Sequence, residues 1–283
     1  MRTPCRVAAF VSLSLLLACG SKDPPATPED MAGASSDDLS GGGGTVDMTG
    51  GGGGELKLTG IWASRIVNAQ IFDSMVLGKD TVTVTTLARV EITQSGLVVT
   101  GKNQVCDVSL TPFKGNQTVY PESALKAIPA DTVTSMLSEN KVGAKYIVPK
   151  RVQLLGWMAK AMPETEALPT DPKDPRVVDA DGDGKPGVTL EIKGGLINGQ
   201  VYVVNRSIIE NGGTVLSADR IVGPSKTTQA QVVLDANPNV LKAPVKTDPD
   251  PDASKSTFAL VRISGAQNDC AYIKKNAATL FAP

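Results

Sequence analysis

Histidine is absent from all 283 residues of this chain, and its absence removes several kinds of chemistry. The sequence cannot form a Ser-His-Asp or Cys-His nucleophilic centre, a zinc site of the HExxH type or an imidazole proton shuttle. A catalytic mechanism would have to use carboxylates, lysine, tyrosine or a bound metal. We therefore expect a non-catalytic protein, with an envelope hydrolase that depends on carboxylates or a metal as the alternative.

An excess of positive charge is also lacking. The chain has 28 Lys and Arg residues against 29 Asp and Glu residues, which gives a formal net charge of −1. A nearly neutral chain offers no basic stripe to a phosphate backbone, so we expect no nucleic-acid partner.

Long apolar runs are scarce, and the one at the N-terminus is short. It covers residues 7–18, is broken by two serines and follows the basic residues Arg2 and Arg6. This is less than the ~20 residues that a membrane-spanning helix needs, and it is typical of the core of a signal peptide. The sequence predicts a signal peptide over residues 1–18.

Residues 16–19, Leu-Leu-Ala-Cys, resemble the lipobox of bacterial lipoproteins, although Leu17 stands where smaller or β-branched residues are commoner. The resemblance implies that Cys19 carries a diacylglycerol on its sulfur and becomes the new N-terminus. Several acyl chains anchor a protein stably, because each buried CH₂ contributes about 0.8 kcal/mol. The next residues, Gly-Ser, resemble those that follow the cysteine in lipoproteins released to the outer membrane of the cell envelope. The alternative is an ordinary signal peptide with Cys19 incidental.

Composition changes sharply after the cysteine. Residues 19–54 are rich in Gly, Ser, Asp and Pro and contain no aromatic residue. Such a segment cannot bury enough apolar surface to fold, so we expect a flexible tether that spans roughly 30–35 Å. Residues 55–283 then form a single domain.

Only four cysteines are present. Cys5 leaves with the signal peptide and Cys19 is the lipidation site, which leaves Cys106 and Cys270. In an oxidising compartment these two most simply form one disulfide. Two buried free thiols are the alternative.

Apolar and polar residues alternate along much of the domain. Val188, Leu190 and Ile192 are one such series, and Asn198-Gly199 is a strong hairpin turn after it. Strands joined by short turns indicate an antiparallel β-barrel or sandwich. The segments with this pattern are 81–93, 97–99, 105–110, 188–193, 201–204, 214–222, 229–234 and 257–263.

A different segment, about 120–178, interrupts the strands. Its spacing predicts short helices over 121–128, 131–139 and 152–162, and four prolines mark 163–175 as loop. We expect this helical insertion to cap one end of a barrel or cover its mouth.

Gly60 and Trp62 resemble the G-x-W start of lipocalin-type barrels. The resemblance implies a lipocalin-like barrel whose closed end is plugged by Trp62. The alternative is a core tryptophan in another kind of sheet.

The sharpest motif is Asp-x-Asp-x-Asp-Gly at residues 179–184, which resembles the first half of an EF-hand calcium loop. On that scheme Asp179, Asp181 and Asp183 supply side-chain oxygens and Lys185 supplies its backbone carbonyl. Loop position twelve is Leu190 instead of the bidentate Glu, so we expect structural calcium of low affinity, with Kd of about 10⁻⁴–10⁻³ M.

Further ligands for this calcium could come from Asp171 or Asp174, while Glu191 lies one place late in a predicted strand. The alternative for the motif is a solvated acidic turn. A second acidic run, residues 248–252, lacks the glycine and is expected to be an exposed loop.

The general layout, a glycine-rich tether and an acidic loop, is similar to that of lipoproteins of myxobacteria and related soil bacteria. The sequence thus favours a membrane-anchored lipoprotein whose β-domain binds an apolar ligand, a glycan or another envelope protein.

Overall fold

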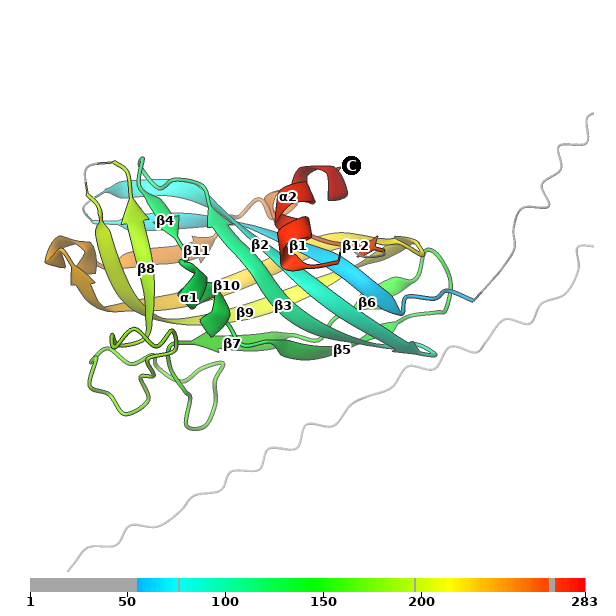
Figure 1. Cartoon of the computed structure of the whole chain (residues 1–283), viewed down its shortest axis with the longest axis horizontal. Helices are drawn as coiled ribbons and strands as arrows, with labels where there is room; N and C mark the ends of the chain where they lie inside the picture. The colour runs from blue at the N-terminus through cyan, green and yellow to red at the C-terminus, as the bar shows by residue number, and fades with distance from the viewer. Residues whose placement is uncertain (1–54, 76, 196, 265–267, 283) are drawn as a thin grey trace, which may run out of the picture. The chain divides into compact units, whose positions relative to one another are not determined.

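The computed structural model describes residues 55–75, 77–195, 197–264 and 268–282. The predicted signal peptide, Cys19 and the tether lie outside the described residues. The domain is mainly β, as predicted, and its antiparallel strands form one sheet of twelve (Figure 1). No helix among the described residues is long and apolar enough to cross a membrane.

The strands are β1 (Gly60–Ser74), β2 (Gly78–Ser95), β3 (Val98–Leu110), β4 (Gln117–Val119), β5 (Asp131–Leu137), β6 (Lys145–Ile147), β7 (Arg151–Leu155), β8 (Val188–Lys193), β9 (Gly199–Ser217), β10 (Arg220–Asn237), β11 (Val245–Pro249) and β12 (Thr257–Ile263). The helices are α1 (Glu122–Ala127), α2 (Cys270–Leu280) and the short 3₁₀ turns η1 (Asn239–Lys242) and η2 (Ala253–Lys255).

The sheet closes partly into a ring. Strands β9, β10, β12, β1, β2 and β3 follow one another by hydrogen bonding. At one end β5 and β6 join β3 to β9, and at the other end β4 and β8 do so. Figure 1 shows β4 and β8 on the left and β5 and β6 toward the right. Between them, β7 pairs with β9 and α1 contacts β3 and β8.

The β5–β6 end of the ring is filled by a dense apolar cluster around Trp62. Trp62 is fully buried, and its indole N–H donates to the carbonyl of Leu58 at 2.8 Å. The guanidinium of Arg262 lies over the indole, 4.7 Å from the ring centroid, and donates to the carbonyls of Lys57 and Thr59. This cation–π contact with its hydrogen bonds fastens the residues before β1 to the end of β12.

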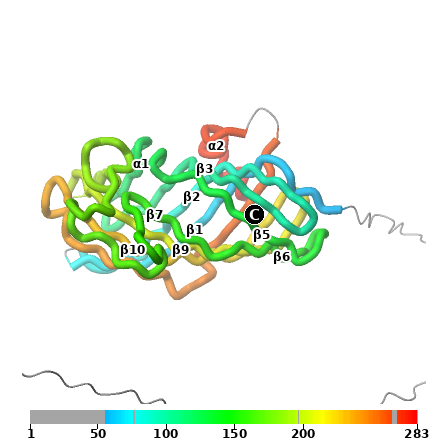
Figure 2. Tube along the Cα trace, turned by 90° about the horizontal axis from the view of Figure 1, so that it is seen from below, coloured from blue at the N-terminus to red at the C-terminus, as the bar shows by residue number. Residues whose placement is uncertain are grey.

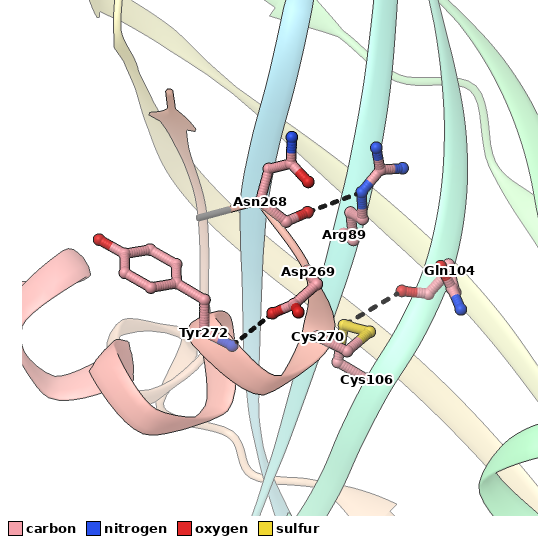
Figure 3. Close-up of a disulfide and its surroundings, with 7 residues drawn as sticks. All are labelled: Arg89, Gln104, Cys106, Asn268, Asp269, Cys270 and Tyr272. Atoms are coloured by element: carbon pink, nitrogen blue, oxygen red, sulfur yellow. Dashed lines mark hydrogen bonds between the residues drawn. A yellow bond between two sulfur atoms is a disulfide. The ribbon is translucent and has the colours of Figure 1, made fainter. Parts of the chain in front are cut away.

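Helix α2 covers the outside of the wall, where it contacts β2 and β3 (Figure 2). Its buried residue Ile273 packs in a second cluster with Ala63 and Leu87. The predicted disulfide is present: Cys106 of β3 is bonded to Cys270, the first residue of α2, with the two Cα atoms 5.0 Å apart (Figure 3). Asp269 caps the helix by accepting from the Tyr272 N–H at 2.7 Å.

The predicted helical insertion contains one helix, three short strands and long loops. The helix over 121–128 is confirmed as α1, but 131–139 contains β5 and 152–162 begins within β7. Residues 131–137 alternate between exposed and more buried positions because β5 pairs with β3. The apolar spacing of these short segments fits a helix or a strand equally, and pairing with long strands decides for strand.

Gly156 ends β7 and starts the long loop to β8. Its φ is +76°, and a Cβ at this position would lie 2.8 Å from the Cα of Gly187, so both the backbone conformation and the close approach require glycine. The loop that follows places Trp157 against Val204 and Leu234. Because Asn205 lines the interior, the neighbouring Val204 faces outward. This loop therefore covers the outside of the wall. The prediction that it caps the barrel mouth is wrong.

Two predicted turns also need correction. The β8–β9 hairpin exists, but β8 ends at Lys193 and β9 begins at Gly199, so the connection is longer than a two-residue turn and Gly199 is part of β9. The segment 214–222, predicted as one strand, contains the turn between β9 and β10.

Candidate functional site

The acidic motif forms a closed loop immediately before β8. The N–H of Ala180 donates to the carbonyl of Gly187 at 3.0 Å, which brings the two ends of the loop together. Gly182 and Gly184 have φ values of +72° and +81°, a region that favours glycine, so the chain can bend sharply between the aspartates. The motif is thus a defined turn that leads into β8.

The three aspartates predicted as ligands are brought together. One carboxylate oxygen from each of Asp179, Asp181 and Asp183 lies within 4.8 Å of the others. Asp179 accepts from the N–H groups of Gly182 at 2.8 Å and Gly184 at 2.9 Å. These backbone bonds fix the carboxylate orientation, and the cluster can hold a metal ion.

Thr189, the second residue of β8, connects this cluster to the sheet. Its N–H donates to Asp181 Oδ2 at 3.0 Å, and its hydroxyl donates to Asp183 Oδ2 at 2.6 Å. Sequence reasoning missed this residue, because the motif stops at the glycine and the contact depends on how the loop folds back on the strand.

Asp181 is the most confined of the three carboxylates. Its Oδ1 is buried and has no hydrogen-bond partner among the described residues. Burial is the main cause that raises the pKa of Asp181, and the charges of Asp183 and Asp179 add to it. A buried, unpartnered carboxylate oxygen beside two like charges is stabilised by a cation.

The additional ligands considered from the sequence do not join the cluster. Asp174 is paired with Arg176, whose Nη2 lies 2.8 Å from Oδ2, and these hydrogen bonds lower the pKa of Asp174 to about 2. Asp171 accepts from the Lys173 N–H at 2.8 Å. Glu191 pairs with Lys193 at 2.6 Å. A cation would therefore complete its shell with backbone carbonyls and water.

Two other residues near the motif have clear places in the fold. Leu190, at loop position twelve, is buried in the apolar cluster at this end of the ring. The ammonium of Lys185 lies 5.6 Å from the centroid of the Tyr202 ring, so its side chain packs on β9.

A second candidate site is the interior of the ring, which changes character along β1. Trp62 lies in the dense end, and Ser64, Asn68 and Gln70 then line a cavity of about 150 Å³. Phe72 lines a further cavity of about 270 Å³ beyond it. These residues alternate along one strand, so they point to the same face, the lumen.

We call the first cavity the waist and the second the end chamber. The end chamber is lined mainly by apolar side chains, among them Phe72, Leu110, Leu190 and Val201. Val84, Tyr120 and Gln229 line both cavities, so the two adjoin each other. The interior therefore holds two adjoining cavities and is packed at the Trp62 end.

Comparison with known proteins found no similarity: no protein-family model, no curated protein and no solved structure matches this chain. The geometry of the acidic loop and of the lumen is what supports a function.

Proposed function

We propose that this protein is a lipid-anchored lipoprotein of the bacterial cell envelope whose lipocalin-like β-domain holds a small ligand in its lumen. The observation that carries the proposal is the end chamber, a cavity of about 270 Å³ lined mainly by apolar side chains from both halves of the chain. Protein interiors are normally close-packed, and apolar cavities of this kind are where small molecules bind.

The anchor in this proposal comes from the lipobox and Cys19. It has its own test: the chain produced in a bacterium should partition with membranes, and Cys19→Ser should move it to the soluble fraction. A Cys19→Ser protein that still partitions with membranes would contradict the anchor.

Calcium is the cation we assign to the acidic loop. The three clustered ligands are carboxylate oxygens, which suit a hard cation, and a loop completed by carbonyls and water suits the irregular coordination of calcium better than the strict octahedron of magnesium. Zinc prefers imidazole and thiolate ligands, and the chain has no histidine. The role of the ion is to hold the loop against β8.

A binding experiment tests the lumen. The unlipidated chain, Cys19→Ser, is titrated with the uncharged fluorophore N-phenylnaphthylamine, whose emission rises in an apolar site. Val201→Phe places a larger side chain in the end chamber, where Val201 is only 6 % exposed. We expect it to weaken binding at least tenfold.

The matched control is Leu216→Phe, on the same strand but 50 % exposed. It adds the same ring outside the lumen and should leave the affinity unchanged. Equal loss in both variants, or no saturable binding to the parent chain, would reject the proposed function.

A further inference from the structure

The waist differs from the end chamber because polar side chains stand among the apolar ones in its walls. Several strands contribute hydroxyl and amide side chains to a cavity of about 150 Å³. These side chains include Asn68, Gln70, Asn103, Asn205, Ser207 and Asn211. Part of the set is internally satisfied: the hydroxyl of Ser225, a buried residue, lies 3.0 Å from Asn68 Oδ1 and 2.8 Å from Asn211 Oδ1.

Other polar atoms of the waist have no hydrogen-bond partner among the described residues. Gln70 is only 2 % exposed and its Oε1 is an unpartnered acceptor. Asn205 is 6 % exposed and its Nδ2 is an unpartnered donor. The Nε of Arg151, which also lines the waist, is a third buried atom of this kind. Unpartnered buried polar groups are costly, so a molecule in the waist that supplies hydrogen bonds is stabilised.

The waist has no surplus charge to offer. Asp131 and Arg151 are the two formally charged residues among the described lining, and they pair with each other at 2.8 Å. Burial raises the pKa of Tyr120, at the junction with the end chamber, to about 12, so its phenol is neutral at neutral pH. An ionised group brought into the waist would lose its hydration without meeting an unpaired opposite charge, which is unfavourable.

We infer that the lumen takes an amphipathic molecule whose uncharged polar group, with both a donor and an acceptor, lies in the waist against Gln70 and Asn205 while its apolar chain fills the end chamber. This inference rests on the proposed function and adds the class of ligand. A primary amide or an alcohol on an alkyl chain has this chemistry. A carboxylate has acceptors only and carries a charge.

The test compares two ligands with the same chain, octanamide and octanoate, by their competition with N-phenylnaphthylamine for the Cys19→Ser chain at pH 7. Octanamide should bind at least tenfold more tightly than octanoate. Gln70→Leu keeps the volume but removes the acceptor, so the affinity for octanamide should fall about tenfold, or about 1.4 kcal/mol. The affinity for the fluorophore should stay within twofold, because its site is the end chamber.

Gln104→Leu is the matched control, since Gln104 is exposed on β3, and it should leave both affinities unchanged. Asn205→Leu provides a second variant of the waist, with the same expected selective loss. If the fluorophore binds but octanamide and octanoate bind equally well, this inference is overturned and the proposed function stands. The same holds if the fluorophore binds but neither waist variant changes the affinity for octanamide. Absence of all saturable binding would reject both.

Discussion

Neutralising Asp181 should change the stability of the domain in opposite directions with and without calcium. The Asp181 carboxylate lies within 4.8 Å of those of Asp179 and Asp183. Without a cation, each such pair of like charges costs about 1 kcal/mol in a water-like dielectric. Burial raises the pKa of Asp181, so the folded state holds its proton more strongly than the unfolded state. Stability therefore falls as the pH rises through the raised pKa, and the cost is complete once the carboxylate is ionised in the folded state.

Asp181→Asn removes that cost and also removes a ligand. In chelator it should raise the melting temperature by about 4–8 °C, since two pairs at about 1 kcal/mol each are relieved and each kcal/mol corresponds to about 2–4 °C in a domain of this size. In about 5 mM calcium, a site with Kd of about 0.5 mM stabilises the parent chain by about 1.4 kcal/mol, or about 3–6 °C. The variant should lose most of this gain.

Thermal unfolding followed by circular dichroism at pH 7, with calcium and with chelator, measures both effects. Asp171→Asn is the control, because Asp171 lies in the same loop but makes a local bond to the Lys173 N–H and should keep the full calcium shift. A parent chain that does not respond to calcium, or an Asp181→Asn chain that responds fully, would refute the reasoning.

Two further predictions concern the disulfide and the contacts of Arg262, which connect distant parts of the fold. Replacing Cys106 and Cys270 together with serine opens a link between residues 164 positions apart, and urea unfolding should show a loss of up to about 5 kcal/mol; an unchanged midpoint would contradict the role of the disulfide. Arg262→Met keeps an apolar side chain over Trp62 but removes the donors to the carbonyls of Lys57 and Thr59. It should cost about 2–3 kcal/mol in the same assay, and a loss below 0.5 kcal/mol would mean that these bonds add little.

The sequence predicted those features that depend on a local residue pattern or that remain after alternatives are eliminated. The strand predicted over residues 257–263 coincides with β12. Cys106 and Cys270 were the only pair left for a disulfide. The Asp179–Asp183 cluster followed from spacing alone, because a tight turn brings alternate side chains together. The C-terminal helix α2 was not predicted, although Asp269 is a recognisable N-cap.

The polar side chains of the waist could not be predicted, because the polarity of β1 is inverted. Alternation normally assigns the polar side of a strand to solvent. In β1 the polar residues Asn68 and Gln70 face the lumen, while Ala63 and Ala69 are buried on the opposite face. Ala63 packs in the cluster beneath α2, so only the closed ring and its outer helix reveal which face is which.

The central claim is that the lumen is a binding site, and titration of N-phenylnaphthylamine into the Cys19→Ser chain and its Val201→Phe and Leu216→Phe variants tests it most directly. The account predicts saturable binding that Val201→Phe weakens at least tenfold and Leu216→Phe leaves unchanged. Binding that is absent, or equally strong with a phenyl ring placed in the end chamber, would contradict it.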